Sequence, residues 1–262
     1  MKKKIERLTA SLASMLSAWD VVECVTLAEH SETDILDPYF ALVLDVYYRD
    51  AIPPPEQRRA AFSQALDHPG AFESAAAQTK DRFFLEGLPV RVEYKPTRRF
   101  EDFLSHEIDV NLVWVLKNSG TYVFYRLQRS RVLFDRSGWI EGTRRKLAQM
   151  PEAFWKGLRE AFQAKMEHYL SDLGAAALRD DGFFYAESSA GFLRNAAAVL
   201  FMANRRFEPS HRLVDAQLRE LPRLPDDFFG RWDTFLRSNI DMSRAQKYEV
   251  AELIARSVVA FR

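Results

Sequence analysis

The sequence has little cysteine and no excess of charge. A single cysteine, Cys24, among 262 residues excludes an intrachain disulfide and a zinc site built from cysteines. Cys24 lies in the apolar run 21–27, which predicts a buried free thiol. Lys and Arg together number 37, as do Asp and Glu, so the formal net charge is zero and bulk nucleic-acid binding is not expected. The longest uninterrupted apolar run, 196–203, is far shorter than the roughly 20 residues of a membrane span.

Motifs that bind phosphate or carry a nucleophile are also missing. The ten glycines form no Gly-rich phosphate loop, no Rossmann fingerprint and no nucleophile elbow. The five histidines show no metal-ligand spacing. The opening Met1-Lys-Lys-Lys lacks the apolar core of a signal peptide, so a cytoplasmic protein is expected.

One apolar run with a single acid in it stands out, at residues 41–48 (Ala-Leu-Val-Leu-Asp-Val-Tyr-Tyr). Its β-branched and aromatic residues, bounded by proline-containing turns, predict a buried strand. Side chains alternate along a strand, so two faces are expected: Leu42, Leu44 and Val46 on one, and Val43, Asp45 and Tyr47 on the other. A buried carboxylate is costly unless it is paired or bound to a metal. Asp45 is therefore a candidate functional residue.

A second strand, predicted at 89–95, carries Glu93 between two cations. Its charged face is either a solvated edge or the face of a site. If this strand neighbours that of Asp45 in register, the two carboxylates approach one another and need a proton or a bridging cation. Paired carboxylates with open positions suit Mg²⁺. Asp45 and Glu93 are thus predicted as catalytic residues and as metal ligands.

Asp37 is a conditional third catalytic acid. If the chain between Asp37 and Asp45 were extended, the two would lie about 26 Å apart, so Asp37 can join the site only if the chain bends. The alternative interpretation of Asp37 is a turn before Pro38. Of the basic residues near the second strand, Lys95 and Arg98 are candidate phosphate contacts, and a solvated charged face is their alternative.

The chain changes character after Gly138. Before it, further short strands are predicted at 21–27, 82–85, 122–127 and 131–135, with short helices between them, one of them at 72–80. After it, helical periodicity predicts helices at 151–173, where Gly174 interrupts, and at 183–207, 211–221, 226–238 and 243–261. The expected fold class is α+β. A mixed sheet with flanking helices would occupy residues 1–138, and an all-helical bundle residues 139–262.

Four stretches resemble the two-domain bacterial nucleotidyltransferase superfamily, which has a polymerase beta-like fold. They are Asp37-Pro-Tyr-Phe with Leu44-Asp-Val-Tyr47, Leu88-Pro-Val-Arg-Val-Glu-Tyr-Lys95, Arg131-Val-Leu-Phe-Asp-Arg-Ser-Gly138, and Ala198–Phe207 followed by Leu221-Pro-Arg-Leu-Pro225. The resemblance implies a sheet whose carboxylates hold Mg²⁺ for nucleotidyl transfer, with Asp45 and Glu93 matching two of those carboxylates.

Two motifs of that superfamily are absent. In place of its phosphate-binding Gly-Ser pair stands Ala28-Glu-His-Ser31, where only Ser31 could contact phosphate. The superfamily's DxD pair is reduced to one acid in Asp45-Val-Tyr47. Phosphoryl transfer depends on metal and donors positioned around the phosphates, so these losses bear directly on activity.

Three hypotheses follow. The first is a Mg²⁺-dependent nucleotidyltransferase that transfers a nucleotidyl group from an NTP to an unknown hydroxyl acceptor. The second is a catalytically degenerate member that binds a nucleotide or a partner protein. The third is a structural helical module with an accessory sheet domain and no response to nucleotides.

Overall fold

A computed structural model describes residues 1–33, 37, 40–63, 65–75, 79–105, 110–237 and 242–261. The chain forms two compact units, Met1–His106 with Arg126–Gln149, and Glu107–Tyr125 with Met150–Arg262. This division differs from the single boundary expected after residue 138. Helix α7 (Trp139–Ala148) belongs to the first unit, and its buried residues are Ile140, Thr143 and Leu147. The change in composition at Gly138 therefore marks the start of a helix and not the end of a unit.

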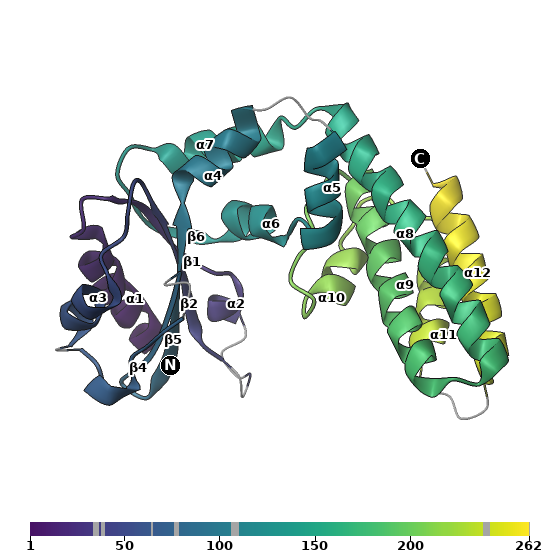
Figure 1. The fold of residues 1–262 in the computed structure, drawn as a ribbon, viewed down its shortest axis with the longest axis horizontal. Helices are drawn as coiled ribbons and strands as arrows, with labels where there is room; N and C mark the ends of the chain where they lie inside the picture. The colour runs from purple at the N-terminus through teal and green to yellow at the C-terminus, as the bar shows by residue number, and fades with distance from the viewer. Residues whose placement is uncertain are drawn as a thin grey trace. The chain divides into compact units, whose positions relative to one another are not determined.

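The described residues of the first unit form one mixed sheet in the order β3-β4-β5-β2-β1-β6 (Figure 1). Strands β2 and β5 pair in parallel, and the other neighbours are antiparallel. The strand bounds are β1 Val22–Leu27, β2 Leu42–Tyr48, β3 Glu73–Ser74, β4 Lys80–Leu85, β5 Leu88–Pro96 and β6 Arg131–Asp135. The α+β class and the central strand at 41–48 are confirmed, and β2 is flanked by β1 and β5.

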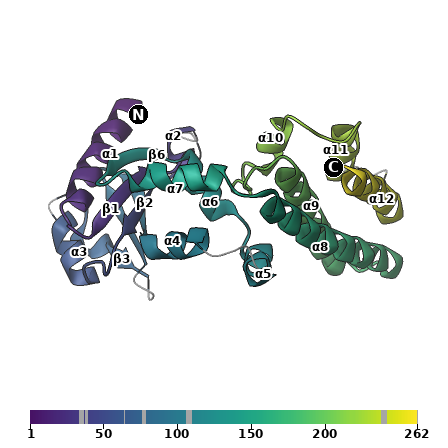
Figure 2. The same cartoon turned by 90° about the horizontal axis from the view of Figure 1, so that it is seen from above.

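The two faces of β2 carry the side chains expected of them. One face joins the hydrophobic core beneath α1 (Lys2–Ser17) and α3 (Pro55–Phe62), with Leu42, Leu44 and Val46 packed in it. On the other face, the ring of Tyr47 contacts Phe100 of α4 (Thr97–Ser105) and Trp139 of α7. Helices α1 and α3 thus cover one side of the sheet, and α4 and α7 lie on the other (Figures 1 and 2).

Two local predictions in this region were wrong. Residues 122–127, expected as a strand, begin helix α6 (Tyr122–Arg129). Their aromatic and β-branched residues favour strands, but they also suit a short buried helix, and Phe124, Tyr125 and Leu127 are all buried. Residues 72–80, expected as a short helix, contain β3 instead, after a 3₁₀ turn at Pro69–Ala71. A short helix, α2 (His30–Thr33), precedes β2.

The described part of the second unit is helical, as expected. Its helices are α5 Val110–Ser119, α8 Glu152–Arg179, α9 Gly182–Ala203, α10 Val214–Arg219, α11 Phe228–Leu236 and α12 Arg244–Ala260. Gly174 does not interrupt α8. A Cβ at this position would lie 2.9 Å from the Tyr248 ring of α12, so glycine lets the two helices approach each other. None of the described helices combines the length and the apolar composition that a membrane crossing requires.

A buried ion pair fixes α3 to the sheet. Arg58 donates from Nε and Nη2 to the two oxygens of Asp81 at 2.8 and 2.9 Å, and both side chains are fully buried. The hydroxyl of Tyr94 donates to Asp81 at 2.8 Å, and the Arg58 guanidinium also donates to the Pro53 carbonyl. Every charge in this group has a partner, which a buried pair requires if it is not to destabilise the fold.

We expect Asp81→Asn to lower the free energy of unfolding of the first unit by about 3–5 kcal/mol, because it leaves the buried Arg58 cation without its counter-charge. Urea denaturation measures the loss, and hydrogen exchange of the β4 and β5 amides assigns it to this unit. Arg7→Gln is the matched control, since it removes an ion pair with Glu86 whose Arg7 side chain is 60% exposed, and its effect on the free energy of unfolding should be far smaller. Equal effects of the two variants would contradict the assignment.

Candidate active site

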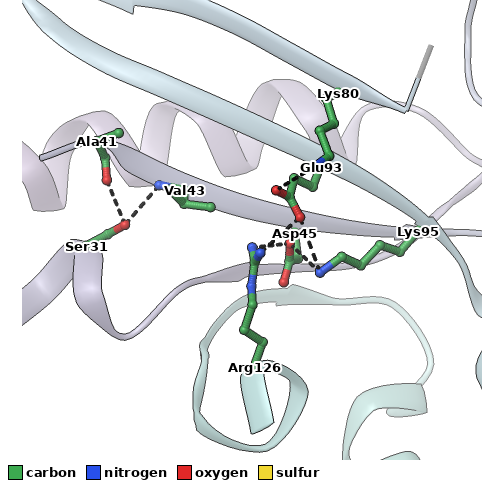
Figure 3. A network of polar contacts seen from close by, with 8 residues as sticks. All are labelled: Ser31, Ala41, Val43, Asp45, Lys80, Glu93, Lys95 and Arg126. Carbon is green, nitrogen blue, oxygen red and sulfur yellow. Dashed lines mark hydrogen bonds and ion pairs between the residues drawn. The ribbon is translucent and has the colours of Figure 1, made fainter. Parts of the chain in front are cut away.

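Asp45 and Glu93 are register partners on the parallel strands β2 and β5. Partners in a parallel pair project to the same face, so the two carboxylates stand side by side (Figure 3). The Asp45 side chain is 1% exposed and that of Glu93 22%. The neighbouring strands and the shared register meet the condition on which the approach of the two carboxylates depended.

Three cations surround these carboxylates. Arg126 of α6 donates from Nη2 to Asp45 Oδ1 at 2.5 Å and from Nη1 to Glu93 Oε2 at 2.9 Å (Figure 3). Lys95 Nζ lies 2.8 Å from Asp45 Oδ1 and 3.7 Å from Glu93 Oε2, and Lys80 Nζ lies 3.5 Å from Glu93 Oε1. We call these five residues the charge cluster. Its three cations and two carboxylates leave one excess positive charge.

The cations determine the protonation of the cluster. Burial alone would raise the pKa of Glu93. The positive charges of Arg126 and Lys95 outweigh this effect, so the pKa of Glu93 falls below its usual value. Burial lowers the pKa of Lys95, and Asp45 offsets part of that effect. Burial and the neighbouring Asp45 raise the pKa of Tyr47. At neutral pH Glu93 is therefore ionised and Tyr47 carries its proton.

A strip of polar atoms on the same face is left without hydrogen bonds. Asp45 Oδ2, Tyr47 Oη and Thr26 Oγ1 are buried, and none has a partner among the described residues. Thr26 is the register partner of Asp45 on β1, and Tyr47 follows Asp45 by two positions on β2, so the three side chains adjoin. Buried polar atoms without partners are rare and costly, so a water molecule or a polar ligand atom fits this strip.

The carboxylate pair does not fit Mg²⁺ as it is arranged. Among the described residues, no group of three or more His, Cys, Asp or Glu side chains could hold a metal ion. Arg126 already bonds to both carboxylates, and Lys95 lies within ion-pair distance of both. A divalent cation at this point would be repelled by both of these neighbours. Metal ligation by Asp45 and Glu93 therefore requires Arg126 and Lys95 to move away.

The other predicted site residues lie in different surroundings. The hydroxyl of Ser31 donates to the Ala41 carbonyl and accepts from the Val43 amide, both at 2.9 Å, and Ser31 is fully buried. A phosphate contact by Ser31 would have to break this link between α2 and β2. The Asp37 carbonyl accepts from the Phe40 amide at 2.9 Å, which is a turn before β2. Arg98 is 87% exposed and pairs with Asp102 along α4 at 3.7 Å.

Arg126 is the residue that the sequence analysis missed. It stands in Tyr122-Val-Phe-Tyr-Arg-Leu127, where it is the one cation among apolar and aromatic residues. In the same way, Asp45 is the one acid in the apolar run 41–48. A buried cation needs a partner as much as a buried acid does. That rule could have found Arg126. Which acid it would meet depends on where α6 lies against the sheet, and local patterns do not contain this information.

Comparisons with known proteins bear on the fold. Residues 118–212 match a family model described as a domain of unknown function, DUF4037. No curated protein matches the sequence. The structure is similar to the crystal structure of a nucleotidyltransferase-like protein from Exiguobacterium sibiricum 255-15, with a TM-score of 0.52 and 14% identity over 97% of this chain and 74% of that one. The fold is nucleotidyltransferase-like. This confirms the expected resemblance at the level of the fold, and an identity this low does not extend to substrate or reaction.

We expect the double variant Arg126→Ala/Lys95→Ala to create a divalent-cation site that the parent protein lacks, because it removes both cations that pair with the two carboxylates. In a thermal-shift assay, Mn²⁺ at millimolar concentration should raise the Tm of this variant by at least about 3 °C and leave that of the parent unchanged. Arg126→Lys, which keeps a cation, and Arg129→Ala, which alters the surface pair with Glu29 on the same helix, are the controls. A parent protein that Mn²⁺ stabilises as much as the variant would show that the cations do not exclude a metal.

Proposed function

We propose that this chain is a nucleotidyltransferase-fold protein that binds a nucleotide through the cations of the charge cluster and does not catalyse metal-assisted transfer. One observation carries the proposal: Arg126 bonds to both carboxylates that would have to hold the metal. The protein's own cation thus supplies the positive charge that this face of the sheet requires.

The charge and exposure of the cluster favour an anionic ligand. The cluster has one excess positive charge, and the Lys80 side chain at its edge is 52% exposed. Ammonium and guanidinium groups bind phosphate oxygens by charge-assisted hydrogen bonds. A nucleotide phosphate would contact Lys80 and compete with Glu93 for Lys95.

The chemistry of transfer has less support. Nucleotidyl transfer requires a metal and donors placed around the phosphates. The Gly-Ser pair is absent from the sequence, and the hydroxyl of Ser31 is bonded to the main chain of Ala41 and Val43. Mg²⁺-dependent transfer from an NTP to a hydroxyl acceptor is the second candidate. The fold and the adjacent carboxylates favour it, but it needs a state in which Arg126 and Lys95 have left the carboxylates.

The test is a thermal-shift panel of ATP, GTP, CTP and UTP, each in EDTA and in Mg²⁺. We expect at least one nucleotide to raise Tm by about 2–6 °C, equally in both conditions. Lys80→Gln should reduce the shift severalfold, because it removes the exposed phosphate contact. Lys156→Gln, a substitution at a similarly exposed lysine in the second unit, should not.

The other outcomes distinguish the rival hypotheses. A shift that appears only with Mg²⁺ and is lost in Asp45→Asn would contradict the proposal and favour the transferase. No shift with any nucleotide at millimolar concentration would overturn nucleotide binding and leave the protein-binding alternative.

A further inference from the structure

A pocket of about 470 Å³ lies wholly within the second unit. Its wall is formed by the connection from α5 to α6, by α9 and α11, and by the segment that leads into α10. Small-molecule sites in proteins typically enclose about 300–1,000 Å³. The segment matched by the family model, 118–212, supplies most of the wall, including Thr121, Arg194 and Glu208.

Glu208 is held in this wall by only one of its two oxygens. The amide and the hydroxyl of Thr121 donate to Glu208 Oε2 at 3.2 and 3.1 Å, and the Glu208 amide donates back to the Thr121 hydroxyl at 2.8 Å. This reciprocal contact joins two segments that lie 87 residues apart, and it fixes the carboxylate. Among the residues that the structure describes, none donates to Oε1.

Arg194 lines the same pocket, but no ion pair joins it to Glu208 among the described residues. Arg194 of α9 is exposed and forms no ion pair with any described residue. Burial raises the pKa of Glu208, and the Thr121 hydrogen bonds and the Arg194 charge offset only part of that rise. One pocket therefore presents a fixed carboxyl group and a guanidinium, each still open to a counter-charge.

The rest of the wall is largely apolar. Leu193 and Phe201 of α9 and Trp232 of α11 line it. The indole N–H of Trp232 donates to Asp215 at 3.1 Å, so the tryptophan offers the pocket an apolar ring. The ligand that fits carries two opposite charges and an apolar body.

We propose that this pocket binds a free amino acid with an apolar side chain, its ammonium group at Glu208 and its carboxylate at Arg194. Leu193, Phe201 and Trp232 contact the apolar side chain. A carboxylate and a guanidinium form a planar bidentate pair. The proposal goes beyond the proposed function and does not rest on it, because every residue involved belongs to the second unit.

Isothermal titration of the full chain with L-leucine, L-methionine and L-phenylalanine tests this. We expect at least one to bind with a sub-millimolar Kd. Its analogue without the carboxylate and its analogue without the amine should each bind at least about tenfold more weakly. Arg194→Gln should abolish the preference over the bare amine, and Glu208→Gln the preference over the bare acid. Arg256→Gln, a substitution at an exposed arginine of α12, should bind as the parent does.

Three results would overturn the proposal. They are no binding of any of the three amino acids at about 10 mM, equal binding of an amino acid and its bare amine or acid, and unchanged binding in Arg194→Gln. Because the Arg194 side chain is exposed and makes no ion pair with any described residue, this variant is expected to fold even if Glu208→Gln does not. Nucleotide binding to the charge cluster is measured separately, so either proposal can fail alone.

Discussion

Arg126 between Asp45 and Glu93 is the interaction on which the charged face of the sheet depends. Two carboxylates in register on adjacent parallel strands repel one another, and one would take up a proton without a nearby cation. Arg126 and Lys95 prevent this, and the pKa of Glu93 stays below its usual value. Lys95 comes from the sheet itself, but Arg126 must be brought in by α6. The register of β2 against β5 and the position of α6 are therefore coupled through one side chain.

A guanidinium in place of a metal ion keeps the charge balance but changes the chemistry. A metal ion can coordinate carboxylates and phosphates together and can exchange its ligands. The guanidinium of Arg126 is tethered, and its two Nη donors already bond to Asp45 and Glu93. Lys80 has only one ion pair within the cluster, at 3.5 Å, and can turn toward a ligand. The same face is thus better suited to holding an anion than to transferring a nucleotidyl group.

The sequence predicted those parts of this arrangement that depend on local periodicity. Asp45 and Glu93 follow from an alternating pattern with one acid in each strand, and the burial of Cys24 follows from its apolar neighbours. Arg126 was missed because its aromatic neighbours suit a strand and a short buried helix equally well. The boundary expected after residue 138 differs from the division into two compact units for a related reason. Helix α7 has the periodicity of a bundle helix, but its apolar side covers the sheet.

The two units treat buried charge in opposite ways, and this contrast indicates where a ligand can act. In the charge cluster, acids and bases meet directly, so most of the cost of burying them is offset within the protein. In the pocket of the second unit, Glu208 is held by the neutral donors of Thr121, and Arg194 lines the same wall without an ion pair to any described residue. The offset there is only partial, and a molecule carrying both charges would complete it. A ligand for the cluster must displace existing partners, whereas a ligand for the pocket need displace only water.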